Sequence, residues 1–165
     1  MKVIPVFALC ALYFFSSFAQ NQEFENIALQ QILKEKKSYQ LDSVKIYVNK
    51  YAVKAPDLKY FSGRNYWHIK GVLKSDCYSA KDSVNNAGTE KGVLKANDEY
   101  VKFGVRKKLP KGFSILMDVY KRFYYCNKVY VLIVIKYDYW IFTQVLVTFD
   151  EEGNITSTDS HSYVT

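Results

Sequence analysis

Histidine and cysteine, which often act as nucleophiles, general bases or metal ligands, are scarce in this chain. The histidines are His68 and His161, and the cysteines outside the N-terminal segment are Cys77 and Cys126. A Cys–His dyad could form only across the fold, and no histidine or cysteine stands at metal-ligand spacing from another. Zinc-binding, nucleophile-elbow and phosphate-loop motifs are absent from the sequence. We therefore expect no metal and no cofactor, and structural or exposed histidines rather than catalytic ones.

A cluster of cations surrounds the turn at Leu109–Pro110, between two predicted strands, and stands beside two aromatic residues. The cations are Arg106, Lys107, Lys108 and Lys111, and the aromatic residues are Tyr100 and Phe103. A turn has no packing need for so many positive charges, so these residues are the candidate binding site for an anionic partner. The alternative is a turn whose charges only face solvent.

Asp118 is the one acidic residue embedded in an apolar strand pattern. Arg122 follows four residues later, on the same face of the predicted strand, and Lys121 is closer still. Glycoside hydrolysis needs two carboxyl groups about 5–10 Å apart in a cleft, whereas the neighbours of Asp118 are cations. We therefore interpret Asp118 as a charge-paired residue on a solvated sheet face.

The N-terminus has the pattern of a secretory signal peptide, which we assign to residues 1–19. Lys2 precedes an uncharged apolar run, Val3–Phe15, which is short for a membrane-spanning helix. Ser17 and Ala19 provide the small residues that cleavage before Gln20 requires. The alternative is an uncleaved anchor. With cleavage, residues 20–165 are exported to the periplasm or the extracellular space, without stable membrane insertion.

An oxidising compartment favours a disulfide bridge between Cys77 and Cys126, the two cysteines that remain after cleavage. Closing a loop of this size stabilises a fold by ~4 kcal/mol in the chain-entropy model. The alternatives are two buried thiols or one catalytic thiol.

The composition indicates one domain with a strong sheet content and a mild basic excess. The formal net charge is +7, and 15 Tyr, 11 Phe and 2 Trp make 17% of the chain aromatic. Aromatic residues are favoured in strands and on binding surfaces. For an exported protein, the anionic partners that this charge favours are glycans, lipid head groups or acidic proteins rather than nucleic acid.

The first half of the chain contains a helical pattern followed by period-two patterns. Apolar residues recur every three or four positions over 23–37, which predicts an amphipathic helix. Alternation over 44–48 and a second run at 66–73 predict strands. Residues 75–97 are rich in polar residues and predict a long polar loop.

The final third predicts consecutive strands separated by short turns, which is typical of an antiparallel meander. These strands are expected at 100–105, 113–125, 129–137, 140–149 and 155–163. The strand at 129–137 is apolar on both faces and should be central, whereas the strand at 155–163 is polar and suits an exposed edge.

The expected fold is α+β, with an N-terminal amphipathic helix packed on a curved antiparallel sheet. One helix followed by long strands, ending in the hairpin from Tyr137 through the turn at 150–154 to Ile155, loosely resembles cystatin-like and NTF2-like domains. The resemblance covers the last third of the chain and has no diagnostic motif, so it implies no functional residue.

These features favour an exported, non-enzymatic binding domain for a protein or an anionic envelope component, including an inhibitor or immunity protein. One alternative is a carrier whose aromatic-lined pocket holds a small apolar ligand. Another is a hydrolase whose site is assembled from distant residues. Asn154-Ile155-Thr156 matches a glycan acceptor pattern placed in a turn.

Overall fold

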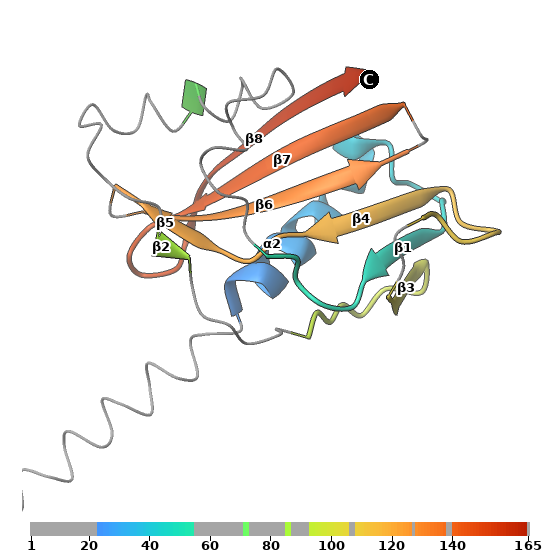
Figure 1. Cartoon of the computed structure of the whole chain (residues 1–165), viewed down its shortest axis with the longest axis horizontal. Helices are drawn as coiled ribbons and strands as arrows, with labels where there is room; N and C mark the ends of the chain where they lie inside the picture. Colours follow the sequence, from blue (N-terminus) through green and yellow to red (C-terminus); the bar gives the residue numbers. More distant parts are fainter. Residues whose placement is uncertain are drawn as a thin grey trace, which may run out of the picture.

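In the residues that it describes, the computed structural model combines an N-terminal α-helix with a mixed β-sheet in an α+β arrangement (Figure 1). It describes residues 23–54, 71–72, 85–86, 93–105, 108–126, 128–137 and 140–164. The elements are α2 (Glu23–Lys34), the 3₁₀ helix η2 (Lys36–Tyr39), β1 (Ile46–Asn49), β2 (Asn85–Asn86), β3 (Val101–Gly104), β4 (Ile115–Val119), β5 (Phe123–Tyr125), β6 (Lys128–Lys136), β7 (Ile141–Phe149) and β8 (Ile155–Val164). No helix within these ranges is long and apolar enough to cross a membrane.

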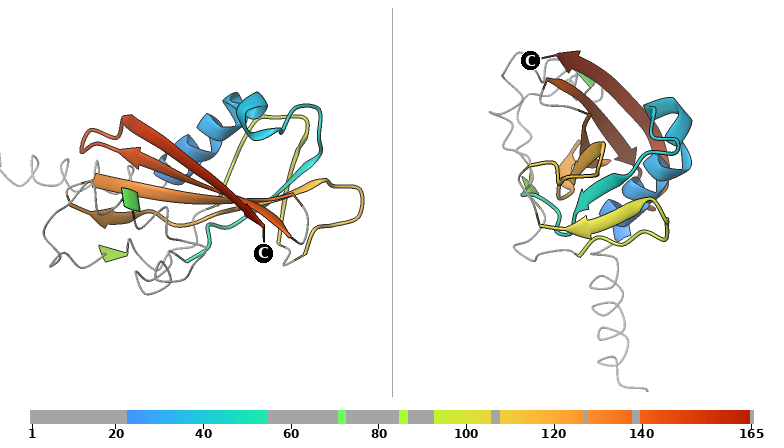
Figure 2. Two further views of the ribbon diagram at one scale, coloured as in Figure 1. Left: turned by 90° about the horizontal axis from the view of Figure 1, so that it is seen from above. Right: turned by 90° about the vertical axis from the view of Figure 1, so that its right-hand side faces the viewer.

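Helix α2 lies across one face of the sheet, which we call the helix face (Figure 2). Its apolar stripe packs there as the periodicity predicts, with Ala28, Leu29 and Ile32 completely buried. The helix ends at Lys34, and η2 continues the expected helical segment to Tyr39. The chain then turns through Gln40, whose positive φ of 54° stops the helical run.

Strand β6 occupies the centre of the sheet, as its two apolar faces predict. It pairs antiparallel with β7 along one edge and with β4 and β5 along the other. Val131 and Ile133 belong to the core under α2, while Leu132 and Val134 belong to a separate core on the opposite face, which we call the second face. The polar strand β8 pairs with β7 among the described strands and forms an edge, also as predicted.

The antiparallel prediction is correct for β4 to β8 and wrong for β1 and β3. Strand β1 lies between β3 and β4 and is parallel to both, with Ile46 level with Val101 and Ile115. Instead of turning straight back, the chain after β3 returns past β1 to begin β4. A four-residue strand extends only about 13 Å. The loop between β3 and β4 therefore has a short distance to span, and it makes the parallel connection without a crossover helix.

A β-bulge divides the strand that the sequence predicts as continuous over 113–125. Val119 faces Ile133 and Phe123 faces Tyr130, so four steps along one strand match three along β6. One extra residue therefore lies between β4 and β5, and it reverses the alternation of side chains.

Because of this bulge, Arg122 does not share a face with Asp118, which corrects the expected pairing. Arg122 is buried, its guanidinium carbon lies 5.4 Å from the centre of the Phe24 ring, and its backbone N–H donates to Glu25 at 2.9 Å. Asp118 is only 7% exposed on the second face. It forms an ion pair with Lys136 of β6 and accepts a hydrogen bond from the Asn49 side chain. The expected solvated face is therefore a buried one.

The expected polar loop at 75–97 also contains ordered elements. Residues 85–86 form β2, which pairs antiparallel with β5. Leu94 is 3% exposed and belongs to the helix-face core, and its backbone N–H donates to Lys50 at 2.9 Å. The expected strand at 66–73 lies mainly outside the described residues, and 71–72 are helical. Leu94 and Ala96 therefore join the end of this segment to the helix-face core.

Removing the cation from the Asp118 ion pair should destabilise the fold. We expect Lys136→Met to lower the free energy of unfolding by about 1–3 kcal/mol, because the buried carboxylate loses a charged donor. The matched control is the double variant Asp118→Val with Lys136→Met, which removes both charges and should recover most of the loss. Urea denaturation measures both, and a double variant less stable than the single one would contradict the assignment.

Candidate binding site at the basic end of the sheet

The parallel register of β1, β3 and β4 gathers their first residues at one end of the sheet. The backbone N–H of Ile46 donates to the Tyr100 carbonyl at 2.9 Å, and that of Ser114 donates to the Lys45 carbonyl at 3.0 Å. Residues that precede three separate strands thereby become neighbours. Parallel strands bring such residues together because all of them start on the same side.

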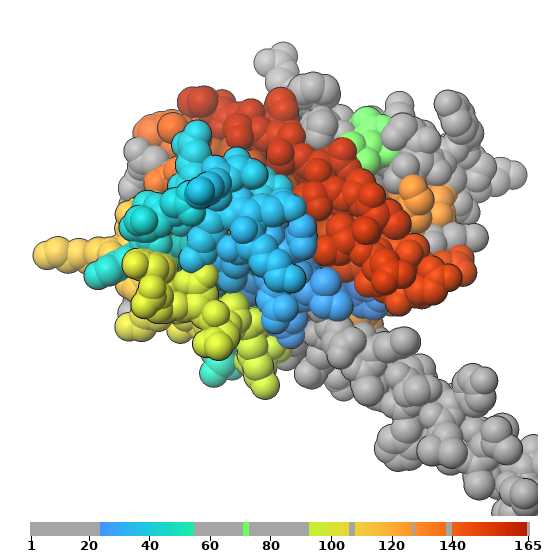
Figure 3. Space-filling view, turned by 180° about the vertical axis from the view of Figure 1, so that it is seen from behind, coloured from blue at the N-terminus to red at the C-terminus, as the bar shows by residue number. Residues whose placement is uncertain are grey.

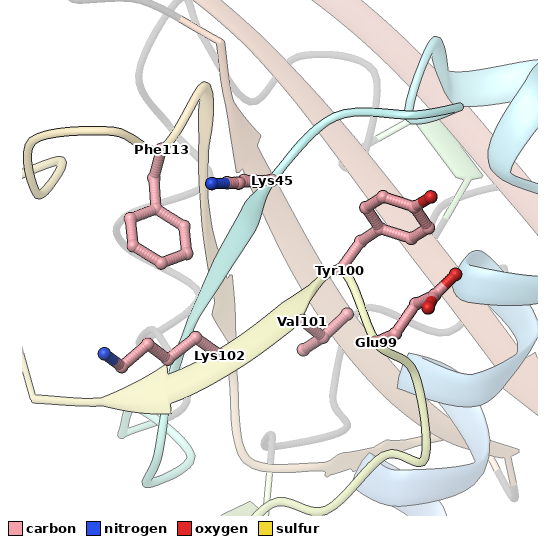
Figure 4. A pocket seen from close by; sticks show the side chains of 6 residues that line it. All are labelled: Lys45, Glu99, Tyr100, Val101, Lys102 and Phe113. Carbon is pink, nitrogen blue, oxygen red and sulfur yellow. The ribbon is translucent and has the colours of Figure 1, made fainter.

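These residues surround an open hollow of about 320 Å³ (Figure 4). Its lining residues are Lys45, Glu99, Tyr100, Val101, Lys102 and Phe113. The side chains of Lys45 and Lys102 extend on the same side as the Phe113 ring, whereas Tyr100 points the other way. The hollow therefore combines two ammonium groups with an aromatic ring, which suits a ligand that has both negative charge and apolar surface.

Phe113 is held in place by Tyr47 of β1. The two rings make an edge-to-face contact with centroids 5.3 Å apart, and Tyr47 is only 6% exposed. Tyr47 in turn covers Gly104, where an added Cβ would come within 1.8 Å of the tyrosine hydroxyl oxygen. The returning loop reaches this position through Gly112, whose φ of +83° suits glycine. Gly104 therefore provides the space in which Tyr47 supports Phe113.

Tyr100 is fixed by charges on its own side of the hollow. The ammonium group of Lys36 lies 5.3 Å from the centre of the Tyr100 ring and forms a 2.5 Å ion pair with Asp98. A second oxygen of Asp98 accepts a hydrogen bond from the Tyr100 backbone N–H at 3.0 Å. Lys36 and Asp98 neutralise each other, so Lys45 and Lys102 supply the positive charge of the hollow against one carboxylate, that of Glu99.

The structure brings together some of the binding residues that the sequence predicts and separates others. Tyr100 is 41% exposed and lines the hollow. Lys108 and Lys111 are exposed on the loop before β4, which projects from the body of the molecule (Figures 1 and 3). Phe103, by contrast, is half-buried against the helix-face core, so it does not join Tyr100 at the surface. Arg106 and Lys107 lie outside the described residues.

Sequence reasoning missed Lys45, Lys102 and Phe113 as members of this site. Lys45 and Lys102 are exposed and stand between apolar neighbours that are buried or half-buried. Their proximity depends on the parallel pairing of β1 with β3, for which the sequence contains no signal. The two lysines could have been identified as neighbours only if the pairing of the two strands had been known.

Catalytic or metal-binding clusters are not apparent in the described ranges. No group of three or more His, Cys, Asp and Glu side chains there is placed to hold a metal ion. His161 is half-exposed on β8, and Cys126 has a positive φ of 48° at the end of β5. His68 and Cys77 lie outside the described residues, so the bridge between Cys77 and Cys126 remains a prediction.

The tyrosines with perturbed acidity also have structural roles. Burial, reinforced by Glu35, raises the pKa of Tyr39 to about 12. Burial likewise raises the pKa of Tyr137, whose hydroxyl donates to the Tyr39 carbonyl at 2.8 Å. Both phenols remain protonated at neutral pH, and the Tyr137 hydroxyl connects the end of β6 to the backbone of η2.

The glycan acceptor pattern lies in the turn between β7 and β8. Asn154 is exposed, its backbone N–H donates to Asp150 at 2.8 Å and its side-chain amide donates to the same carboxylate at 3.1 Å. The backbone N–H of Asn154 holds the pKa of Asp150 below its usual value. The amide nitrogen that would be glycosylated thus has a structural contact within the turn.

The second face contains buried polar atoms as well as aromatic rings. The side-chain oxygens of Gln144 and Thr148 have no hydrogen-bond partner among the residues that the structure describes, and each residue is 1% exposed. Such atoms are normally paired with protein or water. Stacked rings of Phe123 and Tyr130 lie on the same face. This combination is the feature that favours the carrier alternative.

Comparison with protein-family models, curated proteins and solved structures finds no match to this chain.

Adding one methyl group at Gly104 should disturb the support of the hollow. We expect Gly104→Ala to lower the free energy of unfolding by about 1–3 kcal/mol, because Tyr47 must move away from a position fixed by Phe113. The matched control is Gly71→Ala, since an added Cβ there meets nothing within 4 Å. Thermal unfolding compares the two variants, and equal stability would show that Tyr47 does not need the space above Gly104.

Proposed function

We propose that this protein is an exported, non-enzymatic binding domain that captures an anionic partner at the basic end of its sheet. The partner is an acidic protein or an anionic component of the cell envelope. The observation that supports this most directly is the hollow in which Lys45 and Lys102 flank Phe113.

The charge distribution around the hollow supports the proposal. Lys108 and Lys111 lie on the loop that leads from β3 towards Phe113 and β4, so they extend the positive surface beyond the hollow. Several cations on a projecting loop attract a negative surface over roughly a Debye length, about 8–10 Å. The aromatic ring between the lysines adds apolar contact once the partner has arrived. Long-range attraction and short-range contact are therefore available at one place.

Reversing the charge of the hollow should weaken binding of a polyanion. We expect the double variant Lys45→Glu with Lys102→Glu to bind dextran sulfate at least tenfold more weakly than the wild type, as measured by titration calorimetry. The dependence of affinity on ionic strength should also become shallower, because fewer ion pairs form.

The matched control is Lys54→Glu with Lys95→Glu, which changes the net charge by the same amount. Both control lysines are exposed and lie beyond the far end of β1: Lys54 follows Val53, which pairs with Tyr120, and Lys95 follows Leu94, whose backbone N–H donates to the Lys50 carbonyl. We expect this variant to lose less than threefold in affinity. Equal losses in the two variants, with thermal unfolding unchanged, would show that overall charge rather than the hollow determines binding.

A further inference from the structure

The antiparallel pairing of β4, β6, β7 and β8 brings the start of β7 and the end of β8 to the basic end of the sheet. Leu116, near the start of β4, lies opposite Lys136 at the end of β6, and Lys136 lies opposite Phe142 of β7. Ile141, the first residue of β7, lies opposite Val164, the last residue of β8. These strand ends therefore lie on the same side of the molecule as the loop before β4 (Figures 1 and 2).

Large apolar side chains are exposed at these strand ends. Val164 is 75% exposed, Ile141 is 45% exposed, and Trp140, which precedes Ile141 in the chain, is 62% exposed. Because Ile141 and Val164 are directly opposed on adjacent strands, the three residues form one apolar corner, which we call the apolar tip. Neighbouring apolar residues that are exposed together often mark a surface that binds another molecule or a membrane.

The 3₁₀ helix η2 brings a further cation to this end. The Tyr137 hydroxyl donates to the Tyr39 carbonyl of η2 at 2.8 Å, and the Tyr137 backbone N–H donates to the Ile141 carbonyl at 3.1 Å. The exposed Lys37 of η2 therefore lies at the same end as the apolar tip. Among the described residues, the exposed cations here are Lys37, Lys45, Lys102, Lys108 and Lys111, and the exposed carboxylates are those of Asp42 and Glu99.

This combination of cations and apolar side chains favours an anionic lipid surface over an acidic protein. Lysines are attracted to negative headgroups, and tryptophan and aliphatic side chains insert at the boundary between headgroups and acyl chains. The apolar tip belongs to β7 and β8, whereas the hollow belongs to β1, β3 and β4, on the other side of β6. A fluid bilayer adapts to such separate groups, whereas a folded protein partner needs a complementary packed surface.

We propose that the protein binds an anionic lipid bilayer through the basic end of its sheet. The apolar tip inserts among the headgroups, and the lysines of the hollow and of the loop before β4 lie on the charged surface. This inference rests on the proposed function and names its anionic partner as lipid. Reversible attachment to a membrane commonly combines an apolar anchor with a basic patch, because each alone binds weakly.

Vesicle co-sedimentation tests the lipid partner. We expect the wild type to bind vesicles of phosphatidylcholine with phosphatidylglycerol at least tenfold more tightly than vesicles of phosphatidylcholine alone, because only the first carry a negative charge. We expect Trp140→Ser with Val164→Ser to bind the anionic vesicles at least tenfold more weakly than the wild type. The same variant should bind dextran sulfate with an affinity within twofold of the wild type, because no charge is altered.

The matched control is Val105→Ser with Tyr124→Ser, which also removes one aliphatic and one aromatic side chain from the surface. Val105 is 70% exposed and Tyr124 is 39% exposed. Val105 follows the end of β3, and Tyr124 pairs with Val129 near the start of β6, so both lie away from the basic end. We expect this control to lose less than twofold in vesicle binding, with thermal unfolding confirming that both double variants are folded.

The outcomes separate this inference from the proposed function. Equal losses in the two double variants, or a wild type that does not bind anionic vesicles, would overturn the lipid partner. If that wild type still binds dextran sulfate, the proposed function stands and an acidic protein becomes the partner. A wild type that fails to bind dextran sulfate contradicts the proposed function itself.

Discussion

The double-sided burial of β6 is the constraint on which the rest of the structure depends. Val131 and Ile133 must leave water on one face, and Leu132 and Val134 must leave water on the other. Fully burying each such side chain stabilises the fold by about 1.5–3 kcal/mol. A strand with this pattern is stable only with neighbours at both edges and cover on both faces, so β7, β4 and α2 take their places around it.

The position of β6 divides the sheet into two regions. On one side, β7 and β8 extend antiparallel from it, and β8 is rich in polar residues. On the other side, β4 pairs with β6 and then with the parallel strands β1 and β3, whose first residues make the basic hollow. The ion pair between Asp118 of β4 and Lys136 of β6 connects this second region to the central strand.

The parts of the fold that the sequence predicts are those with strong local periodicity. The stripe that includes Leu29 and Ile32 predicts α2, the run at 129–137 that is apolar on both faces predicts a central β6, and the polar run at 155–163 predicts an edge. Pairing partners are a different kind of information, because they depend on contacts between residues far apart in the chain. The parallel placement of β1 and the bulge before Phe123 both belong to this kind, and neither has a sequence signal of its own.

In the candidate site, too, the residues with a local sequence signal were predictable and those that depend on long-range pairing were not. Tyr100, Lys108 and Lys111 are visible as an aromatic residue and cations near a turn, and the structure places them at the surface of one end of the molecule. Phe103 was included for its type, yet strand alternation directs it to the core with Val101. Lys45 and Lys102 come together only through the parallel register, so no reading of local spacing finds them.

Amide hydrogen exchange followed residue by residue tests the central place of β6 most directly. If the double-sided core organises the fold, the amides of Val131 and Ile133 should be among the slowest to exchange, at a rate set by global unfolding, while those of β3 exchange much faster through local opening. Exchange of the β6 amides as fast as those of β3, under conditions in which the protein is folded, would contradict this account.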